Sequence, residues 1–178
     1  MRRCLLVLLG FAVLPFFTPA LAASPSIPTL FAGQITAIKR DRRSPAILLP
    51  TSMPIGFVGP HAPVHGRMYP GGGPSGGGYG LELGDVPKCG GVDACFIASF
   101  SARKGGKIDP GFTTVTVPGA SQAQYHGLLC GGSCSQPQIE YIFHRVLYTI
   151  QAVLTVSSTK DESTMIAAAE GSIKAGPR

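Results

Sequence analysis

Apolar residues recur at helical spacing near both ends of the chain. Within residues 26–41 the apolar positions are Leu30, Phe31, Ile35 and Ile38, and Ser26 lies where a helix cap is expected. A second stripe consists of Met165, Ile166, Ala169 and Ile173. The run Thr159-Lys160-Asp161-Glu162 fits a capping box before this stripe, and Gly176-Pro177 fits its end. The pattern therefore predicts an N-terminal and a C-terminal helix.

Between these helices the pattern changes to short runs rich in alternating and β-branched residues, which is typical of strands. The expected strands are 79–83, 95–100, 113–117, 123–129, 138–143 and 146–156, with a turn at His144-Arg145. A further apolar run, Ala46-Ile47-Leu48-Leu49, predicts a brief buried or edge strand closed by Pro50. We expect an α+β fold, a mostly antiparallel β-sheet of five or six strands with the two helices.

Residues 53–78 predict a long irregular loop. Prolines at 54, 60, 63, 70 and 74 and two glycine clusters oppose any long regular element. Loops of this length in a compact domain are either functional or disordered. This Pro/Gly-rich loop is therefore one candidate contact surface.

The first 22 residues have the three parts of a secretory signal peptide. Arg2 and Arg3 precede an apolar run of 14 residues from Cys4 to Phe17, and Ala20 and Ala22 lie at the small-residue positions of a cleavage site. That run is shorter than the roughly 20 residues that span a bilayer. We expect cleavage after Ala22, a single domain over 23–178, a periplasmic or secreted location, and no transmembrane anchor after cleavage.

The charge of the chain is mild and thinly spread. Removal of Arg2 and Arg3 lowers the formal net charge from +6 to +4. The densest basic run, residues 39–43, lacks interleaved aromatic residues and is typical of a solvated helix end. We therefore expect no nucleic-acid partner.

Four cysteines follow the predicted signal peptide: Cys89, Cys95, Cys130 and Cys134. An even number of cysteines in an exported chain predicts two disulfides. We expect local pairs, Cys89–Cys95 and Cys130–Cys134, although sequence alone allows three pairings. A zinc site of four thiolates is the alternative, but the spacings differ from the usual paired zinc knuckles.

Candidate reactive groups are sparse, and the sequence identifies no catalytic residue and no cofactor. His61 and His65 are weak candidates for a zinc or copper site in the Pro/Gly-rich loop. The run Gly73-Pro74-Ser75-Gly76-Gly77 matches a hydrolase motif but lacks the strand and helix that this motif requires. Glu140 and His144 share strand parity and could face one side, and His126 lies on another predicted strand.

Four segments together resemble a group of small exported bacterial proteins of unknown function: Ile47-Leu48-Leu49-Pro50-Thr51-x-x-Pro54, Tyr79-x-Leu81-x-Leu83, Cys89-Gly90-Gly91-x-x-Ala94-Cys95-Phe96 and Cys130-Gly131-x-Ser133-Cys134. The resemblance implies a shared fold and an envelope or secreted location, and it carries no activity, substrate or site.

The sequence thus favours a non-enzymatic exported binding or structural module with an envelope protein or polymer as possible partner. The alternatives are a small periplasmic or secreted hydrolase and a periplasmic metal-binding protein.

Overall fold

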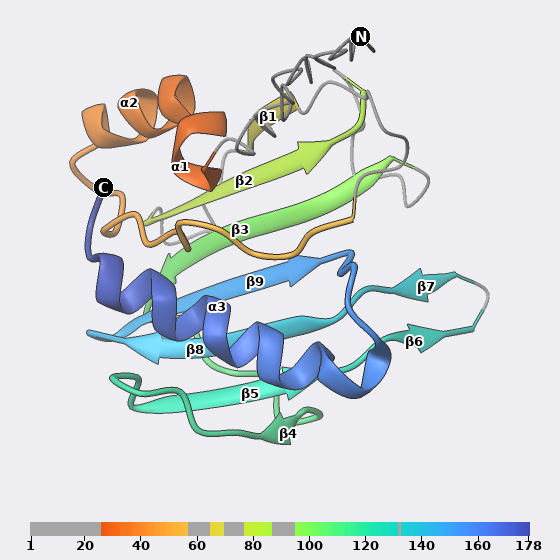
Figure 1. Ribbon diagram of the computed structural model, residues 1–178. Coiled ribbons are helices and arrows are strands. Elements are labelled where there is room, and N and C mark those ends of the chain that lie inside the picture. The colour runs from red at the N-terminus through yellow and green to blue at the C-terminus, as the bar shows by residue number, and fades with distance from the viewer. Residues whose placement is uncertain (1–25, 57–64, 70–76, 87–94, 132) are drawn as a thin grey trace, which may run out of the picture.

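A seven-stranded antiparallel sheet forms the centre of the computed structural model, which describes residues 26–56, 65–69, 77–86, 95–131 and 133–178 (Figure 1). The strand order is β1-β2-β3-β9-β8-β5-β4. The bounds are β1 His65–Tyr69, β2 Gly78–Gly84, β3 Phe96–Lys104, β4 Thr113–Thr114, β5 Gln122–His126, β8 Gln138–Phe143 and β9 Val146–Ala152. This architecture confirms the predicted α+β fold with a mostly antiparallel sheet.

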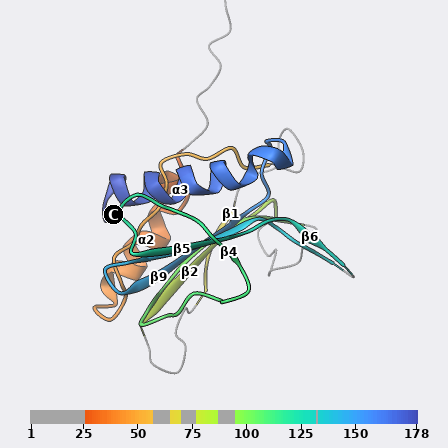
Figure 2. The ribbon, with the colours of Figure 1, turned by 90° about the horizontal axis from the view of Figure 1, so that it is seen from below.

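A two-stranded ribbon extends beyond one end of this sheet (Figures 1 and 2). It consists of β6 (Leu129–Cys130) and β7 (Cys134–Ser135), which pair antiparallel. The sequence predicted neither of these short strands, because the predicted strand 123–129 corresponds to β5 and reaches only the first residue of β6. Leu129 of the ribbon and Leu128, which directly precedes it, are two of the most exposed large apolar side chains among the described residues.

The N-terminal segment forms two short helices where the sequence predicted one. They are α1 (Ile27–Leu30) and α2 (Ala32–Arg40), and Ser26 caps α1 by accepting a hydrogen bond from the Thr29 amide. Phe31 separates them with non-helical backbone angles, φ −107° and ψ 15°. Its ring is fully buried and meets Phe100 edge-on at 5.9 Å. Burial of Phe31 on the sheet thus interrupts the helix.

The C-terminal helix α3 (Asp161–Ala175) lies over the sheet, in contact with β8 and β5 (Figures 1 and 2). The predicted capping box at Thr159 is wrong, because residues Ser158–Lys160 form a 3₁₀ turn and Lys160 precedes α3 without a side-chain cap. Gly176, with φ +72°, ends the helix as predicted.

One sheet face, which we call the covered face, carries most of the hydrophobic core. Its side chains alternate along five strands and are all buried: Tyr79, Leu81, Leu83, Ala98, Phe100, Ala102, Tyr148, Ile150, Ala152, Ile139, Tyr141, Ala123 and Tyr125. Phe31 and Ile35 from the N-terminal helices and Met165 and Ala169 from α3 join the same cluster. Burial of this continuous apolar surface is the main stabilising contribution to the fold.

The apolar run 46–49 does not form the predicted strand, although Ile47, Leu48 and Leu49 are buried as expected. Tyrosine hydroxyls take the place of a neighbouring strand. The Tyr79 hydroxyl accepts from the Leu48 amide at 3.2 Å, and the Tyr148 hydroxyl donates to the Ala46 carbonyl at 3.0 Å. The Arg178 amide donates to the Ile47 carbonyl at 3.1 Å. Backbone groups of the segment are therefore hydrogen-bonded, although the segment is not paired with a neighbouring strand.

The remaining sequence expectations have mixed outcomes. The Pro/Gly-rich segment contains the regular strand β1, which pairs with β2, so the prediction of an irregular loop over 53–78 is wrong for that part. The predicted strand 113–117 shortens to the two residues of β4. The turn at His144-Arg145 is confirmed, and both residues have positive φ, 50° and 63°. Such angles are characteristic of a two-residue hairpin turn.

Candidate functional site

The second face of the sheet, which we call the polar face, carries hydrogen-bonding side chains in two rows across the strands. Strand register places the first row in the order Glu82, Ser99, Gln151, Gln138 and His126. The second row is Ser101, Thr149, Glu140 and Gln124. Residues two apart on a strand point to the same face, so β3, β9, β8 and β5 each contribute to both rows, whereas β2 contributes only Glu82. Nine polar side chains thus converge on one surface.

A hollow of about 380 Å³ lies where the first row meets the β6–β7 ribbon. Its lining consists of Glu82, Phe96, Ser99, Ser133, Cys134, Ser135, Gln136 and Gln151. The Gln151 amide nitrogen donates to the Ser135 hydroxyl at 3.5 Å and to the Gln136 carbonyl at 3.4 Å. These two long contacts hold the ribbon beside the end of β9. The hollow combines a carboxylate, two amides, three hydroxyls and one aromatic ring.

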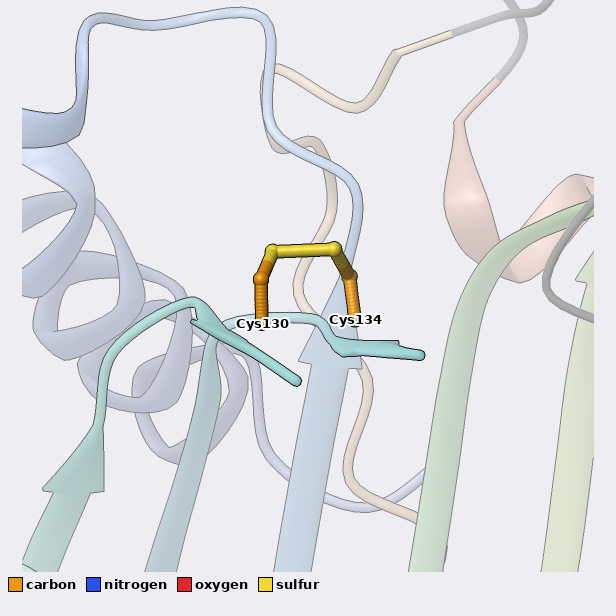
Figure 3. The surroundings of a disulfide bond; sticks show 2 residues. All are labelled: Cys130 and Cys134. Atoms are coloured by element: carbon orange, nitrogen blue, oxygen red, sulfur yellow. A yellow bond between two sulfur atoms is a disulfide. The ribbon is translucent and has the colours of Figure 1, made fainter. Parts of the chain in front are cut away.

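The ribbon is closed by the disulfide Cys130–Cys134 (Figure 3). This bond confirms one of the two predicted local pairs. Cys95 is also disulfide-bonded, while Cys89 lies outside the described residues. The pairing of Cys89 with Cys95 therefore stays a prediction. Cys134 lines the hollow, so the disulfide fixes the wall of this site.

Two glutamates of the polar face are largely buried, Glu82 with 6% and Glu140 with 9% of its surface exposed. Glu140 accepts hydrogen bonds from the Asp109 amide at 3.0 Å and from the Gln138 side chain at 3.2 Å. Charge-assisted bonds of this kind stabilise a buried carboxylate. Glu140 therefore fastens the loop that contains Asp109 against the polar face.

A second hollow of about 550 Å³ lies between that loop and β5. Lys107, Ile108, Ser121, Gln122 and Gln124 are among its lining residues. The Gln124 side-chain oxygen is buried and has no hydrogen-bond partner within the described parts of the chain. A buried acceptor without a donor costs free energy, and a ligand hydroxyl or amide would satisfy it.

The glutamates do not form a catalytic pair. Glu82 lies on β2 and Glu140 on β8, with β3 and β9 between them. Three strand spacings separate the two positions by about 14 Å. Paired carboxylates that cleave a glycosidic bond are at most about 9.5 Å apart. The geometry therefore suits binding by separate polar groups rather than acid–base cleavage by this pair.

The four histidine candidates from the sequence lie in different parts of the chain, and the His61–His65 metal site stays a prediction because His61 is outside the described residues. His65 is the first residue of β1, not a loop residue, and His61 and Ser75 lie outside the described residues. Across the described segments no group of three metal-ligating side chains occurs. His144 lies exposed in its turn, stacked on Phe143 at 4.0 Å, whereas Glu140 bonds Asp109 and Gln138. His126 packs against Phe112 at 4.6 Å. The strand parity that could have placed Glu140 and His144 on one side does not extend to His144, because β8 ends at Phe143.

The polar face was missed at the sequence level, although it left a signal. Ser99 and Ser101, Gln138 and Glu140, and Thr149 and Gln151 are polar pairs separated by one apolar residue. Each pair predicts a polar strand face. Their convergence depends on the strand order β3-β9-β8, which the spacing alone does not give.

Within the segments that the structure describes, no helix combines the length and the hydropathy that crossing a membrane requires. Comparisons with known protein families, with curated proteins and with solved structures find no match to this chain.

Proposed function

We propose that residues 23–178 form an exported, non-enzymatic module that binds a hydroxyl- and amide-bearing polymer of the cell envelope or extracellular space. The binding surface is the polar face together with the hollow beside the ribbon. The observation that carries this proposal is the cross-strand row from Glu82 to Gln138, which runs directly into that hollow.

The chemistry of the row fits a polar polymer that is rich in hydroxyl and amide groups. A glutamine side chain both donates and accepts hydrogen bonds, and a serine hydroxyl does the same. Phe96 adds an apolar ring to the hollow, on which the flat face of a sugar can pack. The row extends over four strands, β2 to β8, so it suits an elongated ligand better than a compact one.

Export rests on the N-terminal segment and on the cysteines. The predicted signal peptide covers residues 1–22. A disulfide such as Cys130–Cys134 forms and persists in an oxidising compartment. Material recovered from the periplasm or the medium should begin at Ala23, and an intact mass that retains residues 1–22 would contradict export by this route.

Binding can be tested by cosedimentation with purified peptidoglycan sacculi, a polymer rich in hydroxyl and amide groups. The test variant combines Ser99→Ala with Gln151→Ala. The control combines Ser163→Ala with Gln34→Ala, which removes the same two side chains from α3 and α2. We expect the test variant to bind at least about tenfold more weakly, since each lost hydrogen bond weakens binding several-fold, and the control to bind like the unaltered chain.

Equal binding by both double variants would contradict the proposed surface. Steady release of soluble fragments from the sacculi would contradict a non-enzymatic role and favour the hydrolase alternative.

A further inference from the structure

Six basic residues that are scattered along the sequence meet at one end of the sheet. They come from the segment after α2, from the end of β3 and the loop that follows it, and from the β8–β9 turn, and we call them the basic end: Arg42, Arg43, Arg103, Lys104, Lys107 and Arg145. All six are exposed. The strand ends concerned lie opposite the β6–β7 ribbon (Figure 1).

Backbone contacts join these three segments. The Gly105 amide donates to the Arg145 carbonyl at 3.2 Å, which places the β8–β9 turn beside the end of β3. The Lys104 amide donates to the Gly77 carbonyl at 2.9 Å. A Cβ atom built on Gly77 would lie 3.2 Å from the Lys104 side chain and 3.5 Å from the Arg43 carbonyl. Gly77 therefore brings Arg43 and Lys104 together.

Asp41 is the acid closest in sequence to this cluster, and it is already engaged. Its carboxylate accepts from the Arg43 amide at 3.0 Å and from the Arg43 guanidinium at 3.3 Å. These hydrogen bonds, with a smaller contribution from the Lys104 charge, lower the pKa of Asp41 below its usual value. Arg43 still has 78% of its side chain exposed. Asp41 therefore offsets only one of the six positive charges, so this end keeps a strong excess of positive charge.

The opposite end of the sheet has a small acidic excess, with two carboxylates beside one lysine, Lys160. Asp161 and Glu162 begin α3 there, beside Tyr125 of β5. The fold therefore separates charge along the strands, even though the net charge of the whole chain is small. A molecule with this asymmetry is oriented by a charged surface, with the basic end toward the negative side.

We propose that the basic end docks onto an anionic phospholipid surface. The six cations are exposed on turns and strand ends, where several of them can meet lipid phosphates at once. A single strand of nucleic acid is instead held in a groove with aromatic side chains that stack on its bases. Cations near an anionic bilayer each strengthen association about fivefold. The docking surface is distinct from the polar face, so either function can fail without the other.

The test uses the chain from Ala23 on, which contains every described residue of the core, in cosedimentation with vesicles. Vesicles of phosphatidylglycerol mixed with phosphatidylcholine present phosphate with net negative charge, and pure phosphatidylcholine vesicles present phosphate without it. We expect binding to the mixed vesicles only. We also expect release at 0.5 M sodium chloride. At that ionic strength the Debye length is below about 8 Å, so salt screens the attraction between the exposed cations and the lipid phosphates.

Matched substitutions separate local docking from net charge. Arg145→Gln removes one cation from the basic end, and Lys160→Gln removes one exposed cation from the far end of the sheet, beside the start of α3. We expect a loss of about fivefold for the first and no change for the second. The triple variant Arg103→Gln, Lys104→Gln, Arg145→Gln should lose binding altogether, with an unchanged circular dichroism spectrum as the check of folding.

Three results would overturn the proposal. These are equal binding to pure phosphatidylcholine, equal losses for Arg145→Gln and Lys160→Gln, and tight binding of a single-stranded oligonucleotide through the same residues without vesicle binding.

Discussion

The two faces of the central sheet are formed by alternate residues of the same strands, and the two sets of residues differ in chemistry. On the covered face, aliphatic side chains and four tyrosine rings pack beneath α3 and the segment 46–50. Three of the tyrosine hydroxyls still make specific bonds. Tyr79 and Tyr148 hold the backbone of that segment, and Tyr141 bonds Ser172 of α3 at 2.6 Å. Because Ser172 donates its own proton to the Ala169 carbonyl, Tyr141 is the donor to Ser172.

None of the described helices packs over the centre of the polar face, and most of its side chains are half-buried. Its hydrogen-bonding groups partly serve the two segments that fold against it, through Glu140 to the loop at Asp109 and through Gln151 to the ribbon. Others, such as Ser99 and Gln124, line hollows. The covered face therefore contributes mainly to the stability of the fold, whereas the polar face keeps hydrogen-bonding groups that the proposed ligand would contact.

The largest expected effect of a single substitution is therefore on the covered face. Ile150 of β9 has 2% of its surface exposed and lies between Phe100 and Ile139 in the register of the sheet. Ile150→Ala should lower the free energy of unfolding by about 2–5 kcal/mol, through lost apolar burial and the cavity left behind. Urea unfolding followed by circular dichroism measures this, and a loss below about 1 kcal/mol would break the distinction between the faces.

Alkaline pH should also destabilise the covered face selectively. Burial raises the pKa of Tyr148 to about 12 and raises the pKa of Tyr79 and Tyr141 above the usual value of 10.0. The folded state thus favours the protonated phenols, and this contribution is fully present below about pH 10. It is lost as the pH rises through 10 to 12 and above, by at most about 1.4 kcal/mol per pH unit for each tyrosine.

Ultraviolet absorbance of tyrosinate and circular dichroism should therefore change together above pH 10. Titration of all five tyrosines near pH 10 in a chain that stays folded would contradict the burial of these hydroxyls.

The ribbon beside the polar face should contribute less to the free energy of unfolding than the covered face does. Replacing both cysteines, Cys130→Ser with Cys134→Ser, opens a loop of only a few residues and should cost about 2 kcal/mol. The sheet should keep its circular dichroism spectrum, because neither cysteine belongs to the hydrophobic core. Loss of the folded spectrum in this double variant would mean that the ribbon, and with it the polar face, is part of the stabilising structure.

The second predicted disulfide can be tested in the same preparation by peptide mapping without reduction. We expect a peptide pair that links Cys89 to Cys95 and no free thiol in the unaltered chain from Ala23 on. A link from Cys95 to Cys130 or Cys134 would contradict local pairing.

The alternation of apolar and polar residues predicted strands where it is regular. It failed where contacts between residues distant in the sequence decide the local structure. The bounds of β8 were predicted correctly, and its hairpin with β9 was expected even though His144 and Arg145 replace glycine at positive φ. The run 46–49 has the composition of a strand, but two tyrosine side chains, Tyr79 and Tyr148, bond its backbone, and no local pattern could place them there. Similarly, Phe31 fits the helical stripe, yet its burial against Phe100 ends α1.

The candidate site depended even more on tertiary structure. The polar pairs on β3, β8 and β9 are visible as alternation, but those strands are neighbours only because β9 returns between β3 and β8. The basic end likewise joins three groups of cations that are about 40 to 100 residues apart in the sequence. The basic run at residues 39–43, taken by itself, predicted only a solvated helix end. Long-range strand pairing, which residue spacing does not encode, assembled both surfaces.

The smallest expected effect belongs to Thr149, the neighbour of Ile150 on β9. Its side chain points to the polar face and is half-buried, between Ser101 and Glu140 in the register. Thr149→Val keeps the β-branched shape that a strand favours and removes one hydroxyl, so we expect the free energy of unfolding to change by less than about 0.5 kcal/mol. The same urea titration measures both neighbours under identical conditions. If Thr149→Val costs as much as Ile150→Ala, the polar face is a second core layer rather than a surface held open for a ligand. If the substitution is neutral for folding but weakens binding to peptidoglycan sacculi, the two faces are separated by function within adjacent residues of one strand.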